Sequence, residues 1–316
     1  MSDIPKWIKI SVAFRLKSPL HLGYMPFKGS VVSPTRYYIP GRNLWGAVTK
    51  RITEHLYEKP NANNYREIGI QVMKNFIFSY FYIYDGKTVY FPFYAEDGLK
   101  YGDNKNSITK SEFEHRFIGS IISTSIDNTG TAKDESLHEI EFINNRFMDE
   151  KGNFKHVKII GSIWVNDRRE INGNEIVLND RGIFIDDFNV IEELILGGES
   201  KYGLGHVVLH SGYKIKFPDI IPFNCDDPEK IEIQQKNTIA AHLMYSKGIK
   251  FRGDIELLSG RGYYYPEYDK PTNKKCVKPG EIILTPKYYL CPGTEILSSD
   301  ELQNIKLAYD GTMTVE

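Results

Sequence analysis

The hydrophobic period of this chain changes between residues 6 and 57, from two to about four. Every second position from Ile8 to Leu16 is apolar, which is typical of a half-buried strand. A loop containing Gly and Pro over 18–41 separates this segment from aliphatic residues at every fourth position: Leu44, Val48, Ile52 and Leu56. They predict a helix over 43–57 with Asn43 as its candidate N-cap. The first 57 residues therefore predict a mixed α+β fold.

The rest of the chain continues this alternation. Aromatic and β-branched residues on both sides of Asp85–Gly86 predict a hairpin. Residues 95–135 are polar and rich in Gly, Asn, Ser and Lys, so we expect a long insertion or hairpin there. Further strands are predicted over 137–142, 156–165 and 204–217, with a short helix over 187–196 that ends at Gly197–Gly198.

The predicted order is strand, helix, strand, insertion, strand, helix, strand. It is the order of ferredoxin-like (RRM-like) units, whose helices cover one sheet face and leave the other available. We expect an α+β, ferredoxin-like core over 1–220 that carries a thumb-like insertion over 95–135. Irregular sequence after 220 predicts a β-rich C-terminal extension over 221–316.

Composition excludes several classes of protein. The 316 residues are 41% hydrophobic, enough for a sizeable core, and the apolar stretch 76–83 is too short to cross a bilayer. The opening residues 1–7 lack an apolar run of signal-peptide type, so we expect a cytoplasmic protein. The three cysteines, Cys225, Cys276 and Cys291, have no metal-ligand spacing. We therefore expect neither a metal nor another cofactor, and no membrane partner.

Charge is distributed unevenly along the chain. Residues 4–53 carry nine Lys or Arg and no Asp or Glu, whereas residues 54–316 carry 31 cations against 40 acids. A cationic segment on an acidic body indicates a surface for anions, with nucleic-acid phosphate as the obvious ligand. A solvated basic face explains the same charges equally well.

Two glycine-containing segments have the composition of anion sites. The first strand ends in Ser18–Gly23, and residues 38–47 lead into the predicted helix, with Gly41 in a turn between Arg36 and Arg42. Backbone N–H groups at a helix start attract anions. A capped helix with two solvated arginines is the simpler interpretation of this turn.

Two later segments complete the set. Residues 196–206 contain four glycines with one Lys and one Tyr, so their backbone can approach a ligand closely. This loop runs from helix to strand in the predicted order, the reverse of a nucleotide-binding loop. The other segment, Ser-Ile-Asp-Asn-Thr-Gly-Thr-Ala over 125–132, precedes the strand over 137–142 and by itself indicates a polar turn.

Together and in this order, the four segments resemble the RAMP (repeat-associated mysterious protein) superfamily of CRISPR effector subunits. The resemblance spans about residues 6–217. It departs from the usual pattern at Arg42-Asn43-Leu44-Trp45 and in the Glu199 and Tyr202 positions of the Gly-rich loop. It implies a backbone-like subunit of a type III effector complex that acts in antiviral defence. The RNA-binding residues that it implies are His21, Arg36, Gly41, Arg42, Asn43, Lys50, Gly198, Ser200, Lys201, Tyr202, Gly203 and Gly205.

The resemblance also implies the partners: guide RNA, complementary target RNA and other CRISPR effector subunits. Related backbone subunits cut RNA with an Asp between the first strand and first helix, but the loop over 23–39 contains no carboxylate. We therefore expect RNA binding without cleavage. The alternative is an endoribonuclease that uses His21 or Asp127 as its catalytic residue. A third hypothesis is an interaction protein whose basic segment docks an acidic partner.

Overall fold

The structure is a computed structural model that describes most of the chain. The described residues are 7–24, 30–103, 105–131, 136–167, 169–210, 220, 222–223, 225–258, 261–262, 282–283, 286–298, 302 and 305–315. Cys276, residues 211–217 of the expected last core strand, and residues 132–135 of the expected insertion lie outside these ranges.

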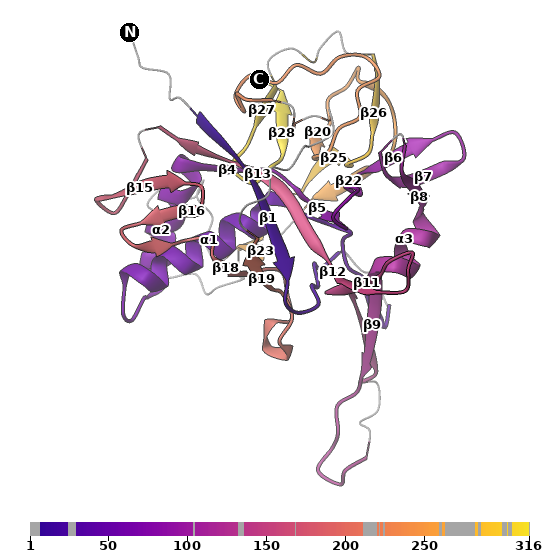
Figure 1. Cartoon of the computed structure of the whole chain (residues 1–316), viewed down its shortest axis with the longest axis horizontal. Helices are drawn as coiled ribbons and strands as arrows, with labels where there is room; N and C mark the ends of the chain where they lie inside the picture. Colours follow the sequence, from indigo (N-terminus) through magenta and orange to yellow (C-terminus); the bar gives the residue numbers. More distant parts are fainter. Residues whose placement is uncertain are drawn as a thin grey trace.

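A central sheet of seven strands runs through the molecule (Figure 1). Its order is β18 (Glu193–Ile195), β19 (His206–Leu209), β1 (Trp7–Leu16), β13 (Lys158–Asn166), β5 (Phe81–Tyr84) and β3 (Tyr38–Ile39), and β4 (Phe76–Phe78) also pairs with β13. Every neighbouring pair is antiparallel. The β1–β13 ladder extends from the pair Trp7–Asn166 to the pair Arg15–Lys158. Because β19 pairs with the other edge of β1, the first strand lies inside the sheet.

Both faces of this sheet are covered. On one face Phe14 packs in a core with Leu44 of helix α1 (Gly41–Leu56). On the other face Trp164 packs in a second core with Leu243 and Leu290, which lie beyond residue 220. The expectation of one available sheet face is therefore wrong, because the C-terminal strands cover it. Strand β13 is apolar at successive positions for this reason, as strands buried on both faces are.

Two helices follow the first strand. Helix α1 begins at Gly41, so the prediction of Asn43 as its N-cap is wrong: Pro40 takes that position and Asn43 lies within the first turn. Leu44, Val48 and Ile52 of the predicted apolar stripe are buried and Leu56 is partly buried. Helix α2 (Ala62–Asn75) was not predicted. Asn61 caps it by accepting from the nitrogens of Asn63 and Asn64. The indole nitrogen of Trp45 donates to Gly69 O at 3.1 Å and joins the two helices.

The predicted helix over 187–196 is wrong. This segment contains strands β17 (Phe188–Asn189) and β18, and β17 belongs to a small sheet with β14 (Glu170–Ile171), β15 (Asn174–Asn179) and β16 (Gly182–Ile185). Leu194 and Leu196 are buried whereas Glu193 and Ile195 are exposed, which is the period of a strand. Pairing of Leu194 with Val207 at the sheet edge outweighs the local helical pattern.

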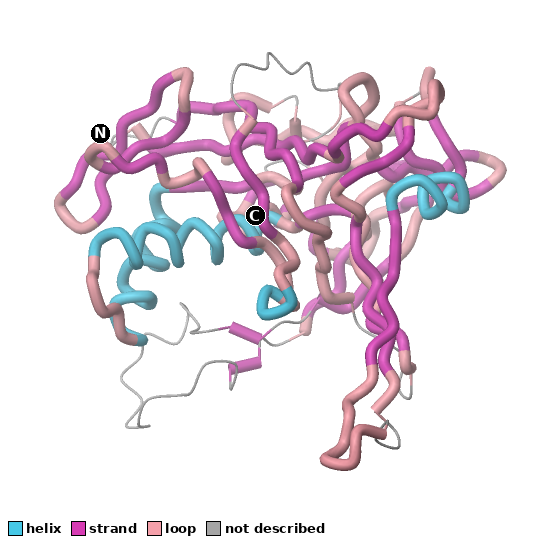
Figure 2. Tube along the Cα trace, turned by 60° about the horizontal axis from the view of Figure 1, so that its bottom comes forward, coloured by secondary structure: helices cyan, strands magenta, loops and turns pink. Residues whose placement is uncertain are grey.

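Residues 95–135 contain two different structures. Strands β6 (Pro92–Ala95), β7 (Gly98–Gly102) and β8 (Ser107–Thr109) form a sheet, and helix α3 (Lys110–Phe117) follows with Thr109 and Glu112 as a capping box. Strands β9 (Ile118–Ser123) and β10 (His138–Ile143) then form a hairpin that projects from the body (Figure 2). Strand β2 (Val32–Ser33) pairs in parallel with Glu139 and Ile140 of β10.

The described part of the chain beyond residue 220 contains strands and no helix. They are β20 (Leu243–Met244), β21 (Lys250–Arg252), β22 (Ile255–Leu258), β23 (Arg261–Gly262), β24 (Ile282–Ile283), β25 (Lys287–Leu290), β26 (Glu295–Ser298), β27 (Ile305–Leu307) and β28 (Met313–Val315).

A smaller hairpin, β11 (Arg146–Met148) with β12 (Phe154–His156), follows β10. None of the described helices is long and apolar enough to cross a membrane.

Candidate functional site

The end of the first strand, Ser18–Gly23, is where distant segments of the chain meet. Leu20 forms a β-bridge with Ile143 at the base of the projecting hairpin, with N–O distances of 2.9 and 2.8 Å. Leu22 N donates to Thr35 Oγ1 at 2.9 Å. The strand end and the strand that follows residues 125–132 are therefore neighbours, whereas residues 125–132 themselves lie at the far end of the hairpin.

The Gly-rich loop over 196–206 packs against the same strand end. Gly198 N donates to His21 O at 2.9 Å, and Gly205 N donates to Pro19 O at 2.7 Å. Gly197 has a φ of +75°, and a Cβ there would lie 2.1 Å from His21 O. The close approach therefore requires glycine at this position. A second predicted segment thus joins the strand end beside the base of the hairpin.

His21 links the strand end to the hairpin. Its side chain is 4% exposed, and its Nδ1 lies 2.7 Å from Glu141 O in β10. A carbonyl oxygen only accepts, so Nδ1 carries the proton. The carboxylate of Glu141 accepts from Thr35 N at 3.2 Å. His21 therefore lies within the packed junction, with its ring fixed between the hairpin and the Gly-rich loop.

The tip of the Gly-rich loop is exposed. Ser200–Tyr202 form a single turn of 3-10 helix (η1) between Glu199 and Gly203, which both have positive φ. Tyr202 is 71% exposed, and Lys201 forms no ion pair with a described residue. The turn therefore presents one cation and one aromatic ring to solvent beside the junction.

The start of helix α1 differs from the open anion site that the sequence predicted. Gly41 is buried, and a Cβ there would lie 2.3 Å from Phe78 O and 2.6 Å from Asp310 O. The C-terminal turn at Asp310 therefore covers the first residue of the helix. Arg42 and Asn43 are half-buried in the first turn, and Lys50 is exposed and pairs with Glu54 at 3.8 Å.

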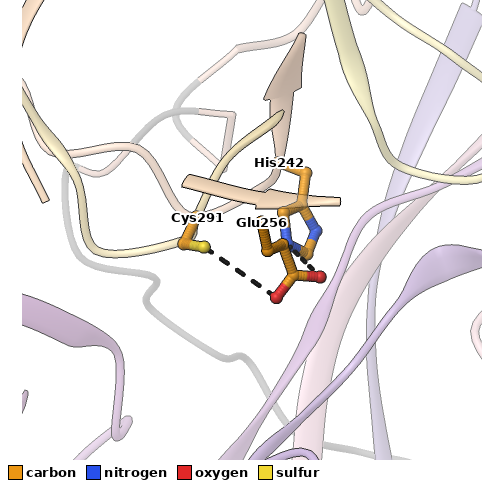
Figure 3. A group of neighbouring side chains, drawn as sticks. All are labelled: His242, Glu256 and Cys291. Carbon is orange, nitrogen blue, oxygen red and sulfur yellow. Dashed lines mark hydrogen bonds and ion pairs between the residues drawn. The ribbon is translucent and has the colours of Figure 1, made fainter. Parts of the chain in front are cut away.

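Arg36 is not a solvated arginine. Its guanidinium binds both carboxylate oxygens of Glu256, at 2.7 and 3.2 Å, and donates to Tyr38 Oη at 2.9 Å. His242 Nε2 lies 3.2 Å from the same carboxylate (Figure 3). Burial alone raises the pKa of Glu256, but its contacts with His242 and Arg36 outweigh burial and bring the pKa to about 2. Arg36 therefore joins the core to the C-terminal strands.

The same cluster is the arrangement closest to a metal site in the described residues. One ligand atom each from His242, Glu256 and Cys291 lies within 4.8 Å of the others (Figure 3). Burial, followed by the charges of Glu256 and Asp254, raises the pKa of Cys291 to about 12, so the thiol is protonated. Arg36 already occupies both oxygens of Glu256. A divalent cation would have to displace a buried guanidinium, so these residues fit a polar link better than a metal centre.

Asp127 stabilises the turn at the end of the hairpin. Its carboxylate accepts hydrogen bonds from the nitrogens and hydroxyls of Thr129 and Thr131. These bonds lower the pKa of Asp127 to about 2. This is the geometry of a turn-forming aspartate, and so weakly basic a carboxylate is poorly suited to accept a proton near neutral pH.

Comparison with known proteins finds similarity among solved structures. No family model and no curated protein matches this sequence. A chain in a type III-B Cmr-beta structure bound to cognate target RNA is 13% identical with a TM-score of 0.48, covering 91% of this chain and 86% of that one. A chain in the Csm3-Csm4 subcomplex of a type III-A CRISPR-Cas interference complex is 15% identical with a TM-score of 0.41, covering 97% of this chain and 98% of that one.

Proposed function

We propose that this chain is a RAMP-superfamily subunit of a type III CRISPR effector complex. It binds guide RNA through contacts with the sugar-phosphate backbone of the RNA. The observation that carries the proposal is the junction at Ser18–Gly23. Two of the four motif segments, 18–23 and 196–206, meet there with the strand that follows the 125–132 segment, through main-chain bonds at His21, Pro19 and Leu20. Motifs so far apart in the sequence have no local reason to meet, so their contact supports reading them as one site.

The strand order supports a ferredoxin-like core. Strands β19, β1, β13 and β4/β5 lie side by side in that order, all antiparallel, and helices α1 and α2 connect β1 to β4. This is the order of the split βαβ unit. The second helix of that unit is replaced by the small sheet of β14 to β17.

Two exposed features flank the junction and are suited to nucleic acid. The η1 turn presents Lys201 and Tyr202, a cation for phosphate and a ring on which a base can stack. The hairpin of β9 and β10 serves as the thumb of this subunit. It carries exposed aliphatic side chains: Ile121, Ile122, Ile126 and Leu137. Such side chains on a projecting hairpin suit contact with bases or with a neighbouring subunit.

The subunit binds RNA without cutting it. Cleavage requires a base near the ribose hydroxyl and a group that stabilises the phosphate in the transition state. His21 is buried and bonded to Glu141 O, and Asp127 is held in its turn with a pKa of about 2. Neither candidate is placed as a general base.

A binding titration tests this proposal. The purified full-length chain is titrated with labelled single-stranded RNA over a range of salt concentrations. We expect Lys201→Ala and Arg42→Ala each to lower the slope of log affinity against log salt by about 0.7, the value for one phosphate contact on a single strand. Lys59→Ala, an exposed lysine between α1 and α2, is the control and should leave the slope unchanged. Absence of RNA binding by the wild type would contradict the proposal.

A further inference from the structure

One residue, His21, connects the Gly-rich loop to the projecting hairpin of β9 and β10. Its main-chain oxygen accepts from Gly198 N at 2.9 Å, and its ring Nδ1 donates to Glu141 O at 2.7 Å. The other ring atom bonded to Cγ faces the loop, since a Cβ added at Gly198 would lie 3.4 Å from His21 Cδ2. The two sides of this buried ring therefore contact the two segments.

Glu141 is held by a second segment as well. Its carboxylate accepts from Thr35 N at 3.2 Å, and Thr35 Oγ1 accepts from Leu22 N at 2.9 Å. The strand end thus holds Glu141 directly through His21 and indirectly through Thr35.

The hairpin is attached to the strand end at two points along β10. The β-bridge between Leu20 and Ile143 is at its base, and the contact between His21 and Glu141 lies further along the same strand. A single attachment point would allow the hairpin to pivot, whereas two points on one strand define a direction. The contact at His21 therefore fixes the direction in which the hairpin leaves the body.

The hairpin is long enough to amplify a small movement at its base. At about 3.3 Å per extended residue, the chain from Ile118 to the turn at Asp127 spans up to about 30 Å. Over that length, a rotation of about 10° at the base moves the turn by about 5 Å. Residues 124–131 are all exposed, so within the described chain the outer hairpin depends on its base for its position.

The η1 turn and the projecting hairpin extend from the body in the same direction (Figure 1 and Figure 2). The turn is connected to His21 through Gly198, and the hairpin is connected to His21 through Glu141. A strand that contacts both sites binds more tightly than either site alone allows, provided that the geometry permits both contacts at once. The separation of the two sites therefore affects affinity.

We propose that His21 is a positioning residue that holds the η1 turn and the projecting hairpin at a fixed separation, so that one RNA strand contacts both. The inference rests on the proposed function for its RNA ligand. It differs from the role implied by the sequence resemblance, because a ring that is 4% exposed acts on RNA through the segments it holds and not by contact.

Three substitutions at His21 separate the hydrogen bond from the shape of the ring. The amide nitrogen of Asn is as many bonds from Cβ as Nδ1 of His is, whereas the amide nitrogen of Gln corresponds to Nε2. His21→Asn therefore keeps a donor for Glu141 O, and His21→Gln places its donor elsewhere. His21→Phe keeps a ring but has no donor.

Pulsed EPR on the full-length protein without RNA measures the separation. Spin-labelled noncanonical amino acids are placed at the exposed positions Ser200 and Asn128. We expect one narrow distance distribution in the wild type and in His21→Asn, and a broader or shifted one in His21→Phe and His21→Gln. Labels at the exposed Lys59 and Glu175 are the control and should give the same distance in all four proteins. An unchanged distribution in His21→Phe would overturn the proposal.

RNA titrations over a range of salt concentrations test the functional consequence. His21→Phe should bind labelled single-stranded RNA about tenfold or more weakly, because the two contacts no longer act together. Its salt slope should equal that of the wild type, since no cation is removed, and His21→Asn should restore most of the affinity. A slope lower by about 0.7 in His21→Phe would show that His21 binds phosphate directly and would overturn the positioning role.

The outcomes distinguish the two proposals. If Lys201→Ala weakens RNA binding while His21→Phe keeps the affinity of the wild type, the positioning role is wrong and the proposed function stands. Should His21→Phe fail to fold, equal RNA affinities of His21→Asn and His21→Gln would overturn the positioning role. Failure of the wild type to bind RNA would overturn both proposals.

Discussion

Gly198 N donates a 2.9 Å hydrogen bond to His21 O, and a side chain on the adjacent Gly197 would collide with that same oxygen. The Gly-rich loop therefore has its shape because it lies against the end of the first strand. The glycines of this loop have different structural roles. Gly197 allows the loop to contact the strand end, whereas Gly203 allows the turn at the exposed tip.

This difference predicts the effect of alanine at two positions. Gly197→Ala adds a Cβ 2.1 Å from His21 O at a φ of +75°, whereas Gly203→Ala has a φ of +81° and meets nothing within 4 Å. Gly203→Ala should cost about 1–2 kcal/mol of unfolding free energy from the backbone alone. Gly197→Ala should cost clearly more, because the contact must open. Urea unfolding of both variants measures the difference, and equal losses would contradict the packing described here.

The buried pair of Arg36 and Glu256 predicts a large loss of stability. Both side chains are more than four-fifths buried, so Arg36→Met leaves the carboxylate without its bidentate partner. We expect a loss of about 3–5 kcal/mol in unfolding free energy. Lys50→Met, which breaks the exposed pair with Glu54, is the control and should cost no more than about 0.5 kcal/mol. If Arg36→Met lost as little unfolding free energy as the control, the pair of Arg36 and Glu256 would not join the core to the C-terminal strands.

The pKa of Glu256 predicts how stability depends on pH. It is about 2 in the folded chain, below the value of about 4.3 for an unfolded glutamate. The carboxylate therefore contributes stability above about pH 4.3 that is lost as the pH falls toward 2. The stability difference between the wild type and Glu256→Gln should narrow over that interval in urea unfolding. A constant difference would contradict the assigned shift.

The positions of His21 and Asp127 predict the result of a cleavage assay. The chain, incubated with guide and labelled complementary RNA, should give no evenly spaced products, with or without EDTA. Glu141→Gln belongs in the assay, because Glu141 brings a carboxylate to the loop that has none of its own. Regular products that vanish in His21→Ala, Asp127→Ala or Glu141→Gln would show the subunit to be a ribonuclease.

Hydrophobic spacing correctly predicted those strands and helices whose buried side chains recur at the period of the element itself. The alternation over 8–16 gave strand β1, and the four-residue spacing after Asn43 gave helix α1. In α1 a single apolar face packs against the core, and in β1 the alternating Val12, Phe14 and Leu16 pack in the core on the helix side, so the period directly reflects that burial.

Elements decided by distant partners were not predicted. Residues 187–196 form strands because Leu194 pairs with Val207, and the second sheet face is buried because strands beyond residue 220 cover it. Glu256 has no sequence signal that connects it to Arg36.

The most direct test of the account is the identity of the RNA that the chain carries in its own cells. The tagged full-length protein is isolated from its native host, and the RNA that co-purifies is sequenced, with Lys201→Ala combined with Arg42→Ala as the matched variant. The account predicts strong enrichment of CRISPR guide RNAs with the wild type and much less with the variant. Recovery of no RNA, or of RNA with the composition of the total cellular pool, would contradict it.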